Sequence, residues 1–154
     1  MTKRSAGLLL FRRTSSLEVF LVHPGGPFWS KKDDGAWTVP KGEYGESEDP
    51  LAAARREFEE ETGFTRDGNF LPLGEVKQTG GKIVVAWALE GDIDPGQVRS
   101  NTFSLEWPPK SGKIREFPEV DRACWFSPAE ARRKILPAQT PFLVRLAEHL
   151  ALEI

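Results

Sequence analysis

Four glutamates lie within five consecutive positions of one segment, at Glu57, Glu59, Glu60 and Glu61. In a helix, residues three and four positions apart are neighbours, so Glu57, Glu60 and Glu61 would share one face and repel one another. They would also lie in the last turns, where the helix dipole disfavours anions. Clustered carboxylates become favourable when a hard divalent cation such as Mg²⁺, Mn²⁺ or Ca²⁺ binds between them. We therefore consider a metal site here, with a solvated acidic face as the alternative.

The segment that carries these glutamates has the signals of a helix over residues 50–62. Asp49 is a good N-cap, and Pro50 suits the first helical position. The segment itself is rich in strong helix formers, and Gly63 follows it as a stop. The sequence therefore predicts a helix that ends directly after the glutamates.

The remaining pattern predicts the sheet and the other helices that must position this segment. Short apolar runs predict strands at residues 4–12, 18–23, 70–78, 82–91 and 122–126, with a brief strand within 36–40. A helix is expected from Ser127-Pro128 onward and another over about 138–152, whereas 92–120 is irregular and rich in Pro and Gly. This order of strands and helices favours an α/β or α+β sandwich around a central sheet.

Length and charge exclude several classes of protein. The chain has 154 residues and a formal net charge of −2, which predicts one domain spanning residues 1–154. Such a charge gives no general attraction to a nucleic acid polymer or an anionic membrane. No apolar run reaches the ~18 residues of a membrane span, and the N-terminus makes a poor signal peptide. Together with a single cysteine, which rules out an intrachain disulfide, these features predict a cytoplasmic protein.

The two histidines and the cysteine suggest no separate chemistry. His23 ends a predicted strand and His149 lies on the last predicted helix, so we expect both to be structural. Cys124 lies in an apolar strand pattern and is expected to be buried and inert. No zinc-ligand spacing and no Ser-His-Asp arrangement is present.

The glutamate segment and the loop before it match a known motif. From Gly42 the sequence reads GEYGESEDPLAAARREFEEETGF, which resembles the Nudix box, G-x5-E-x7-R-E-U-x-E-E-x-G-U, where U is a bulky apolar residue. Its fixed positions are all filled, by Gly42, Glu48, Arg56, Glu57, Phe58, Glu60, Glu61, Gly63 and Phe64. The one mild departure is Phe58, because an aliphatic residue is more usual there, and it concerns packing rather than chemistry.

The resemblance implies a fold and a reaction. Nudix proteins are α/β/α sandwiches with a mixed central sheet, and their enzymes let water break a phosphoanhydride bond in a nucleoside diphosphate linked to another moiety, X. By similarity, Glu57, Glu60 and Glu61 would bind Mg²⁺, with Mn²⁺ as a substitute, and Gly42 would add a backbone carbonyl. The substrate would be a small nucleotide or another pyrophosphate, and a homodimer would be compatible with the family.

Other positions of the box would support the reaction. Arg56 would orient the carboxylates through an ion pair, and Glu48 would support the site from the loop. A carboxylate can serve as general base, and the sequence does not decide which one. In some family members the base lies outside the box, and Glu119, at the mouth of a predicted strand, is the best candidate of this kind. Glu116 and Glu106 are less favoured, and the alternative for Glu119 is an exposed loop acid.

Substrate contacts are expected on two sides of the box. The lead-in of Pro40, Lys41 and Gly42 is similar to that of Nudix enzymes acting on dinucleoside polyphosphates and inositol pyrophosphates, and Lys41 would meet a phosphate. In the segment 106–115, Trp107 could stack on a base and Lys113 could hold a phosphate, unless the segment is simply a mobile loop. The lead-in favours a nucleoside triphosphate or a dinucleoside polyphosphate.

Two alternatives to the enzyme remain. A Nudix-fold module that binds or regulates without turnover is one, although such proteins usually lose glutamates of the box, whereas this chain keeps them all. A purely structural acidic helix is the other. Metal-dependent cleavage of a substrate would exclude both.

Overall fold

The computed structural model describes residues 2–151. Its strands are β1 (Arg4–Arg13), β2 (Leu17–Pro24), β3 (Lys41–Glu43), β4 (Leu71–Lys77), β5 (Ile83–Glu90), β6 (Thr102–Glu106), β7 (Ile114–Pro118) and β8 (Val120–Phe126). Its helices are α1 (Pro50–Thr62), α2 (Pro128–Lys134) and α3 (Thr140–Leu150), with short 3-10 turns η1 (Pro95–Gln97) and η2 (Pro137–Gln139). Among residues 2–151, no helix combines the length and the apolar character needed to cross a membrane.

A mixed sheet forms the centre of the molecule. Its strands follow the order β4-β5-β1-β2-β8, and β3 pairs with β1 outside this path. β1 runs parallel to β5 and antiparallel to β2 and β3. Residues Ser5 to Gly7 of β1 pair with β3, and Phe11 to Arg13 pair with β2, so both partners lie along the same strand. The short β3 therefore holds the start of the Nudix-like motif against the central strand.

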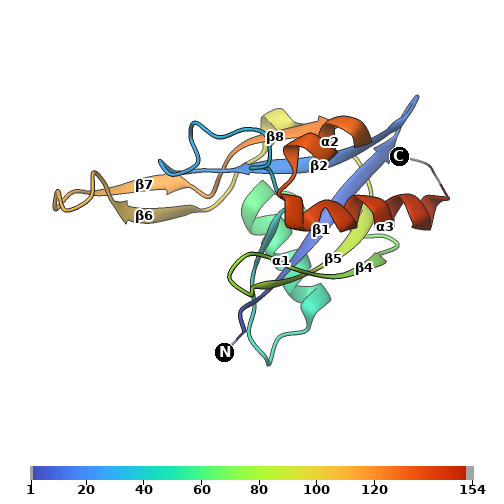
Figure 1. The fold of residues 1–154 in the computed structure, drawn as a ribbon, viewed down its shortest axis with the longest axis horizontal. Coiled ribbons are helices and arrows are strands. Elements are labelled where there is room, and N and C mark those ends of the chain that lie inside the picture. Colours follow the sequence, from blue (N-terminus) through green and yellow to red (C-terminus); the bar gives the residue numbers. More distant parts are fainter. Residues whose placement is uncertain (1, 152–154) are drawn as a thin grey trace.

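The sheet is covered on both faces, which confirms the predicted α/β/α sandwich (Figure 1). Side chains of a strand alternate between faces. In β1, Leu8 and Leu10 pack in the cluster that contains Phe58 of α1, whereas Leu9 packs in the cluster that contains Phe142 of α3. The hydrophobic face of each helix is thereby buried against the sheet, which fixes the position of α1 relative to β1.

Helix α1 covers the predicted residues and has the predicted ends. The Asp49 carboxylate accepts a hydrogen bond from the Ala52 amide at 3.0 Å, and Pro50 occupies the first turn. Gly63 follows the helix with φ 81°, the left-handed conformation that glycine adopts without steric cost. These local signals explain why the helix could be predicted from sequence.

The last turn of α1 contains no basic side chain, and backbone amides of a later segment donate hydrogen bonds to its carbonyls. The Asn101 amide donates to the Glu60 carbonyl and the Arg99 amide donates to the Thr62 carbonyl, both at 2.8 Å. These carbonyls have no partner inside the helix, so the chain that follows η1 satisfies them. The glutamates thus sit on a helix end that is tied to a distant segment.

Several predicted boundaries differ from the structure. The predicted strand at 36–40 forms only isolated bridges, of Thr38 with Val22 and of Trp37 with Ile135. The irregular segment 92–120 contains η1 and the β6–β7 hairpin, which projects away from the body of the sheet (Figure 1). The last helix begins at Thr140, and its predicted end at residue 152 lies outside the described residues.

The prediction that Cys124 is buried was wrong, because its side chain is exposed. β8 is an edge strand of the sheet, and β2 is its one neighbouring strand in the path. His23 is fully buried, and its ring nitrogens lie 2.7 Å from an Asp121 carboxylate oxygen and 2.7 Å from the Lys32 carbonyl oxygen. Both ring nitrogens of this histidine have partners within the protein, as expected for a structural residue.

Candidate active site

The glutamates of α1 face the start of the motif on β3. The Lys41 amide of β3 donates to the Glu61 carboxylate at 3.3 Å. The Glu57 side chain is buried, and its carboxylate lies against the α-carbon of Gly42. Glu59 is exposed on the other side of the helix. The structure therefore places Glu57 and Glu61 together with Lys41 and Gly42 and leaves Glu59 out.

Arg56 connects three of the carboxylates. Its guanidinium makes two hydrogen bonds to Glu48, at 2.8 and 2.9 Å, and donates to Glu57 at 2.7 Å and to Glu60 at 3.3 Å. The hydrogen bond from Arg56 holds the pKa of Glu48 below its ordinary value. A planar guanidinium suits such a multiple contact. Arg56 thus holds carboxylates of the loop and of the helix in one arrangement.

The carboxylates of this cluster are crowded and partly removed from solvent. Burial raises the pKa of Glu61 to about 8, and the nearby charges of Glu119 and Glu57 act in the same direction. Burial also raises the pKa of Glu57 and of Glu119, and the charge of Glu60 adds to both shifts. A raised pKa means that the charged form of each carboxylate is disfavoured where it stands. A bound cation would relieve this condition.

The residues present fit a hard divalent cation by the chemistry of their donors. Three carboxylates and the carbonyl of Gly42 are oxygen ligands of the kind that Mg²⁺ and Mn²⁺ prefer. As the side chains stand, no three acidic, histidine or cysteine side chains within residues 2–151 converge closely enough to hold a metal ion. Arg56 holds Glu57 and Glu60, and the Lys41 amide holds Glu61. Rotation of these flexible side chains would be required to bring the oxygens together.

Glu119 is brought to the cluster from a distant part of the chain. Its amide donates to the Asn101 carbonyl at 2.9 Å, and the Asn101 amide in turn donates to the Glu60 carbonyl at the end of α1. Its own carbonyl accepts from the Gly25 amide at 2.9 Å. These contacts place Glu119 near enough to Glu61 for its charge to raise the pKa of that carboxyl, and its role as a base stays a prediction.

The two less favoured acids lie elsewhere on the hairpin. Glu116 is exposed on β7. Glu106 accepts hydrogen bonds at 3.1 Å from the Lys110 and Gly112 amides and so closes the turn between β6 and β7. Glu106 therefore has a structural role in the turn.

Trp107 and Lys113 lie at the far end of the β6–β7 hairpin (Figure 1). The Trp107 amide donates to the Lys113 carbonyl at 2.9 Å, and the Trp107 ring packs edge-on against Phe28 with centroids 5.5 Å apart. Lys113 is six residues from Glu119, which is about 20 Å along an extended strand. The structure does not bring this pair to the carboxylates, and contact with substrate stays a prediction.

The structure contains a cavity beside Lys41 that the sequence does not predict. Its volume is about 590 Å³. It is lined by Pro24, Trp29, Thr38, Lys41, Gln78, Thr79, Lys82, Leu136, Pro137 and Ala138. These residues come from four separate segments, so no local pattern marks them as a group. Two of them carry a signal in the sequence: Lys41, in the Pro-Lys-Gly lead-in, and Trp29, an aromatic residue in a loop rich in Pro and Gly.

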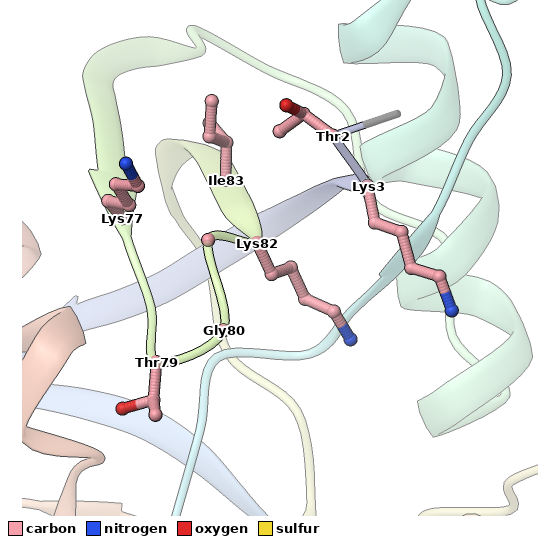
Figure 2. A pocket seen from close by; sticks show the side chains of 8 residues that line it. Thr2, Lys3, Lys77, Thr79, Gly80, Lys82 and Ile83 are labelled. Carbon is pink, nitrogen blue, oxygen red and sulfur yellow. The ribbon is translucent and has the colours of Figure 1, made fainter.

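A second cavity, of about 690 Å³, lies at the turn between β4 and β5. It is lined by Lys3, Lys77 and Lys82 together with residues of the turn. Figure 2 shows the Lys3 and Lys82 side chains extending toward the same side, whereas Lys77 points away from them. Lys82 also lines the first cavity, so positive charge continues from one cavity to the other.

Comparison with known proteins gives the family. The model of the NUDIX domain matches residues 1–146. No curated protein sequence matches the chain. A solved structure of an Ap4A hydrolase from C. elegans, in a binary complex, is similar with a TM-score of 0.68 and 22% identity, covering 96% of this chain and 98% of that chain.

Two further structures show the same likeness. The NUDIX domain of Shewanella oneidensis NrtR complexed with ADP ribose has a TM-score of 0.68 and 17% identity, covering 97% of this chain and 89% of that one. The Nudix hydrolase RenU from M. Smegmatis has a TM-score of 0.59 and 22% identity, covering 96% and 84%. At these identities the likeness concerns the fold, and the match to the domain model carries the assignment. The chain therefore belongs to the Nudix family, the pyrophosphohydrolases that act on acid anhydrides and generally use divalent metal ions.

Proposed function

We propose that this protein is a divalent-metal-dependent pyrophosphohydrolase that cleaves a phosphoanhydride bond in a nucleoside triphosphate or a dinucleoside polyphosphate. One observation supports the proposal: the carboxylates of α1 lie near Glu119 and Lys41 at one end of the helix, where their charges affect one another. The α1 carboxylates are those of Glu57, Glu60 and Glu61. Two similar structures, an Ap4A hydrolase and a domain complexed with ADP ribose, involve ligands of the same general chemistry.

The residues of the box would hold the cation. When bound, Mg²⁺, or Mn²⁺ in its place, supplies Lewis-acid neutralisation of charge at the phosphoanhydride. Glu57, Glu60 and Glu61 would provide carboxylate ligands, with Gly42 adding its carbonyl. Arg56, which contacts Glu57 and Glu60 in the metal-free arrangement, would orient the two carboxylates as they turn toward the cation.

A carboxylate would take the proton from the attacking water. Glu119 suits this role because it lies beside the cluster without belonging to the helix, and burial raises its pKa toward the range useful for a base. Glu61 is the alternative, because the same cause raises its pKa to about 8. The proton would move to the carboxylate oxygen that faces the water.

Lysines would hold the phosphates. Lys41 and Lys82 line the same cavity, burial lowers the pKa of Lys41, and the charge of Lys82 acts in the same direction. A polyanion between them would relieve this repulsion and would extend toward Lys3 along the second cavity. This row of positive charge favours a substrate with several linked phosphates.

A substrate panel tests the proposal. Nucleoside triphosphates, dinucleoside polyphosphates and ADP-ribose are incubated with Mg²⁺, with Mn²⁺ or with EDTA, and the products are separated by chromatography. We expect cleavage that requires the metal and that falls more than tenfold in Glu60→Gln. Glu59→Gln, an exposed neighbour on the same helix, is the matched control and should retain the wild-type rate.

Two results would contradict the proposal. Cleavage that persists in EDTA would remove the metal from the reaction. Binding of a nucleotide without cleavage of any member of the panel would favour the alternative, a Nudix-fold module that binds or regulates without turnover.

A further inference from the structure

The cavity beside Lys41 has the size and walls of a ligand pocket. Its volume of about 590 Å³ lies in the range of small-molecule sites. Trp29, Leu136 and Pro137 give it flat and apolar walls, and Lys41 and Gln78 add polar groups. Such walls suit a planar ring that is attached to an anion.

The cavity borders the candidate active site at one residue. Lys41 lines the cavity, and its amide donates to the Glu61 carboxylate. A phosphate near Lys41 would therefore lie between the carboxylates and the cavity. A ring linked to that phosphate would reach the walls formed by Trp29 and Pro137.

A buried glutamine, Gln139, determines the orientation of the Gln78 side-chain amide, which lines the cavity. Gln139 is completely buried, and its side-chain oxygen accepts from the Val39 amide at 3.1 Å. A backbone amide can only donate, so this contact determines which end of the Gln139 side chain is oxygen. Its nitrogen then donates at 2.9 Å to the Thr38 hydroxyl and at 2.9 Å to the side-chain oxygen of Gln78.

The same chain of contacts determines what Gln78 offers to a ligand. The oxygen of Gln78 is engaged by Gln139, and its side-chain nitrogen has no hydrogen-bond partner among residues 2–151. Gln78 lines the cavity, so the group left for a ligand is an N–H donor. The cavity therefore combines stacking walls with a donor whose orientation is set from the protein interior.

We propose that this cavity holds the nucleobase of the substrate and that Gln78 selects a base with a keto oxygen over one with an amino group. The inference rests on the proposed function for its substrate class. Guanine and uracil present a carbonyl oxygen where adenine and cytosine present an amino group. The nitrogen of Gln78 can donate to the carbonyl, whereas it meets the amino group as a second donor.

The change Gln78→Glu tests the selection directly. A glutamate keeps one oxygen to accept from Gln139 and presents its second oxygen, an acceptor, to the ligand. We expect the ratio of kcat/KM for GTP over ATP to fall about tenfold or more, so that the preference reverses. Gln97→Glu makes the same change at an exposed position outside the cavity and should leave the ratio unaltered.

A binding measurement gives a readout that does not depend on turnover. Calorimetric titration with GMP, UMP, AMP, CMP and ribose 5-phosphate should show the keto nucleotides binding about threefold to tenfold more tightly than the amino nucleotides. In Gln78→Glu this order should reverse. Ribose 5-phosphate lacks a base, so its affinity should differ between the wild type and Gln78→Glu only by the effect of the added negative charge, which is common to all these phosphate ligands.

The outcomes separate this inference from the function on which it rests. Cleavage by the wild type with the same base ratio in Gln78→Glu and Gln97→Glu would overturn the role of Gln78 and leave the enzyme intact. A base preference in the titration without cleavage of any nucleotide would support the cavity and contradict the proposed function. Unaltered binding of all four nucleotides in Trp29→Leu would remove the base from this cavity.

Discussion

The α-carbon of Gly42 faces the Glu57 carboxylate so closely that a methyl group on residue 42 would overlap it. Gly42 belongs to a loop strand and Glu57 to a helix, so this contact joins the two parts of the Nudix box. The glycine is required here by space rather than by backbone angle. A larger residue would move the carboxylate that we assign to the metal.

We predict that Gly42→Ala lowers kcat/KM about tenfold or more while changing the free energy of unfolding by only about 1 kcal/mol. The clash is with the end of a flexible side chain, so it is relieved by displacing the Glu57 carboxylate rather than the backbone. Steady-state kinetics and chemical unfolding measure the two effects. Gly45→Ala is the control, because no atom lies within 4 Å of the added methyl group. Wild-type activity in Gly42→Ala would show that the reaction does not depend on the position of the Glu57 carboxylate.

Arg56→Lys should reduce both stability and activity. A single ammonium cannot reproduce the paired contact with Glu48 and also reach Glu57, which would leave a buried carboxylate without its partner. We expect the free energy of unfolding to fall by about 1–3 kcal/mol and kcat/KM to fall with it. Arg55→Lys is the matched control, because Arg55 is exposed and its nearest ion-pair contact, with Asp67, is 3.7 Å long. Equal behaviour of the two variants would contradict a positioning role for Arg56.

Glu61 should make the metal-free protein less stable as the pH rises. Burial raises the pKa of its carboxyl to about 8 in the folded state, from an ordinary value of 4.5. The folded protein therefore binds the proton more tightly than the unfolded chain, so the stabilisation is complete below about pH 4.5 and is lost as the pH rises through about 8. We expect Glu61→Gln to flatten this dependence and to stabilise the protein by on the order of 1 kcal/mol at high pH in EDTA.

Chemical unfolding in EDTA, at several values from about pH 5 to pH 9, measures this dependence. Added Mg²⁺ should flatten the wild-type profile, and Glu59→Gln should keep the wild-type slope because that residue is exposed. If Glu61→Gln strongly destabilised the metal-free protein, the carboxylates would not be repelling one another in the absence of a cation, and the prediction would be wrong.

The parts of the site that could be predicted from sequence are those set by local spacing. Asp49 and Gly63 mark the ends of α1, and the box places Glu48 and Arg56 eight residues apart, which the structure joins through two hydrogen bonds. The continuous apolar run of β1 likewise predicts a strand buried on both faces. Each of these signals is contained in a few consecutive residues.

The parts that could not be predicted depend on contacts between distant segments. β3 is three residues long and exists because it pairs with β1. Gln78 and Gln139 are 61 residues apart, so no spacing indicates that they share a hydrogen bond. The apolar neighbours of Cys124 predict an interior position, whereas the side chain is exposed on a strand at the edge of the sheet.

Replacing Glu119 tests whether the general base lies inside the Nudix box or outside it. Its backbone is held by Asn101 and Gly25, so replacing its side chain leaves these contacts in place. We expect Glu119→Gln to lower kcat more than tenfold with little change in KM, because a base acts on the chemical step rather than on binding. Glu116→Gln replaces an exposed acid three residues away on β7 and should behave as wild type.

The pH profile identifies the proton acceptor. Burial raises the pKa of the Glu119 carboxyl, so the wild-type rate should increase with pH as this group loses its proton. If Glu119 is the base, the acidic limb disappears in Glu119→Gln and persists in Glu116→Gln. If the limb persists in Glu119→Gln while kcat stays high, the proton goes to a carboxylate of the box, and Glu61 becomes the acceptor to test. Because Glu61 also belongs to the predicted metal site, its replacement would weaken Mg²⁺ activation, whereas loss of Glu119 alone should leave the Mg²⁺ concentration at half-maximal rate unchanged.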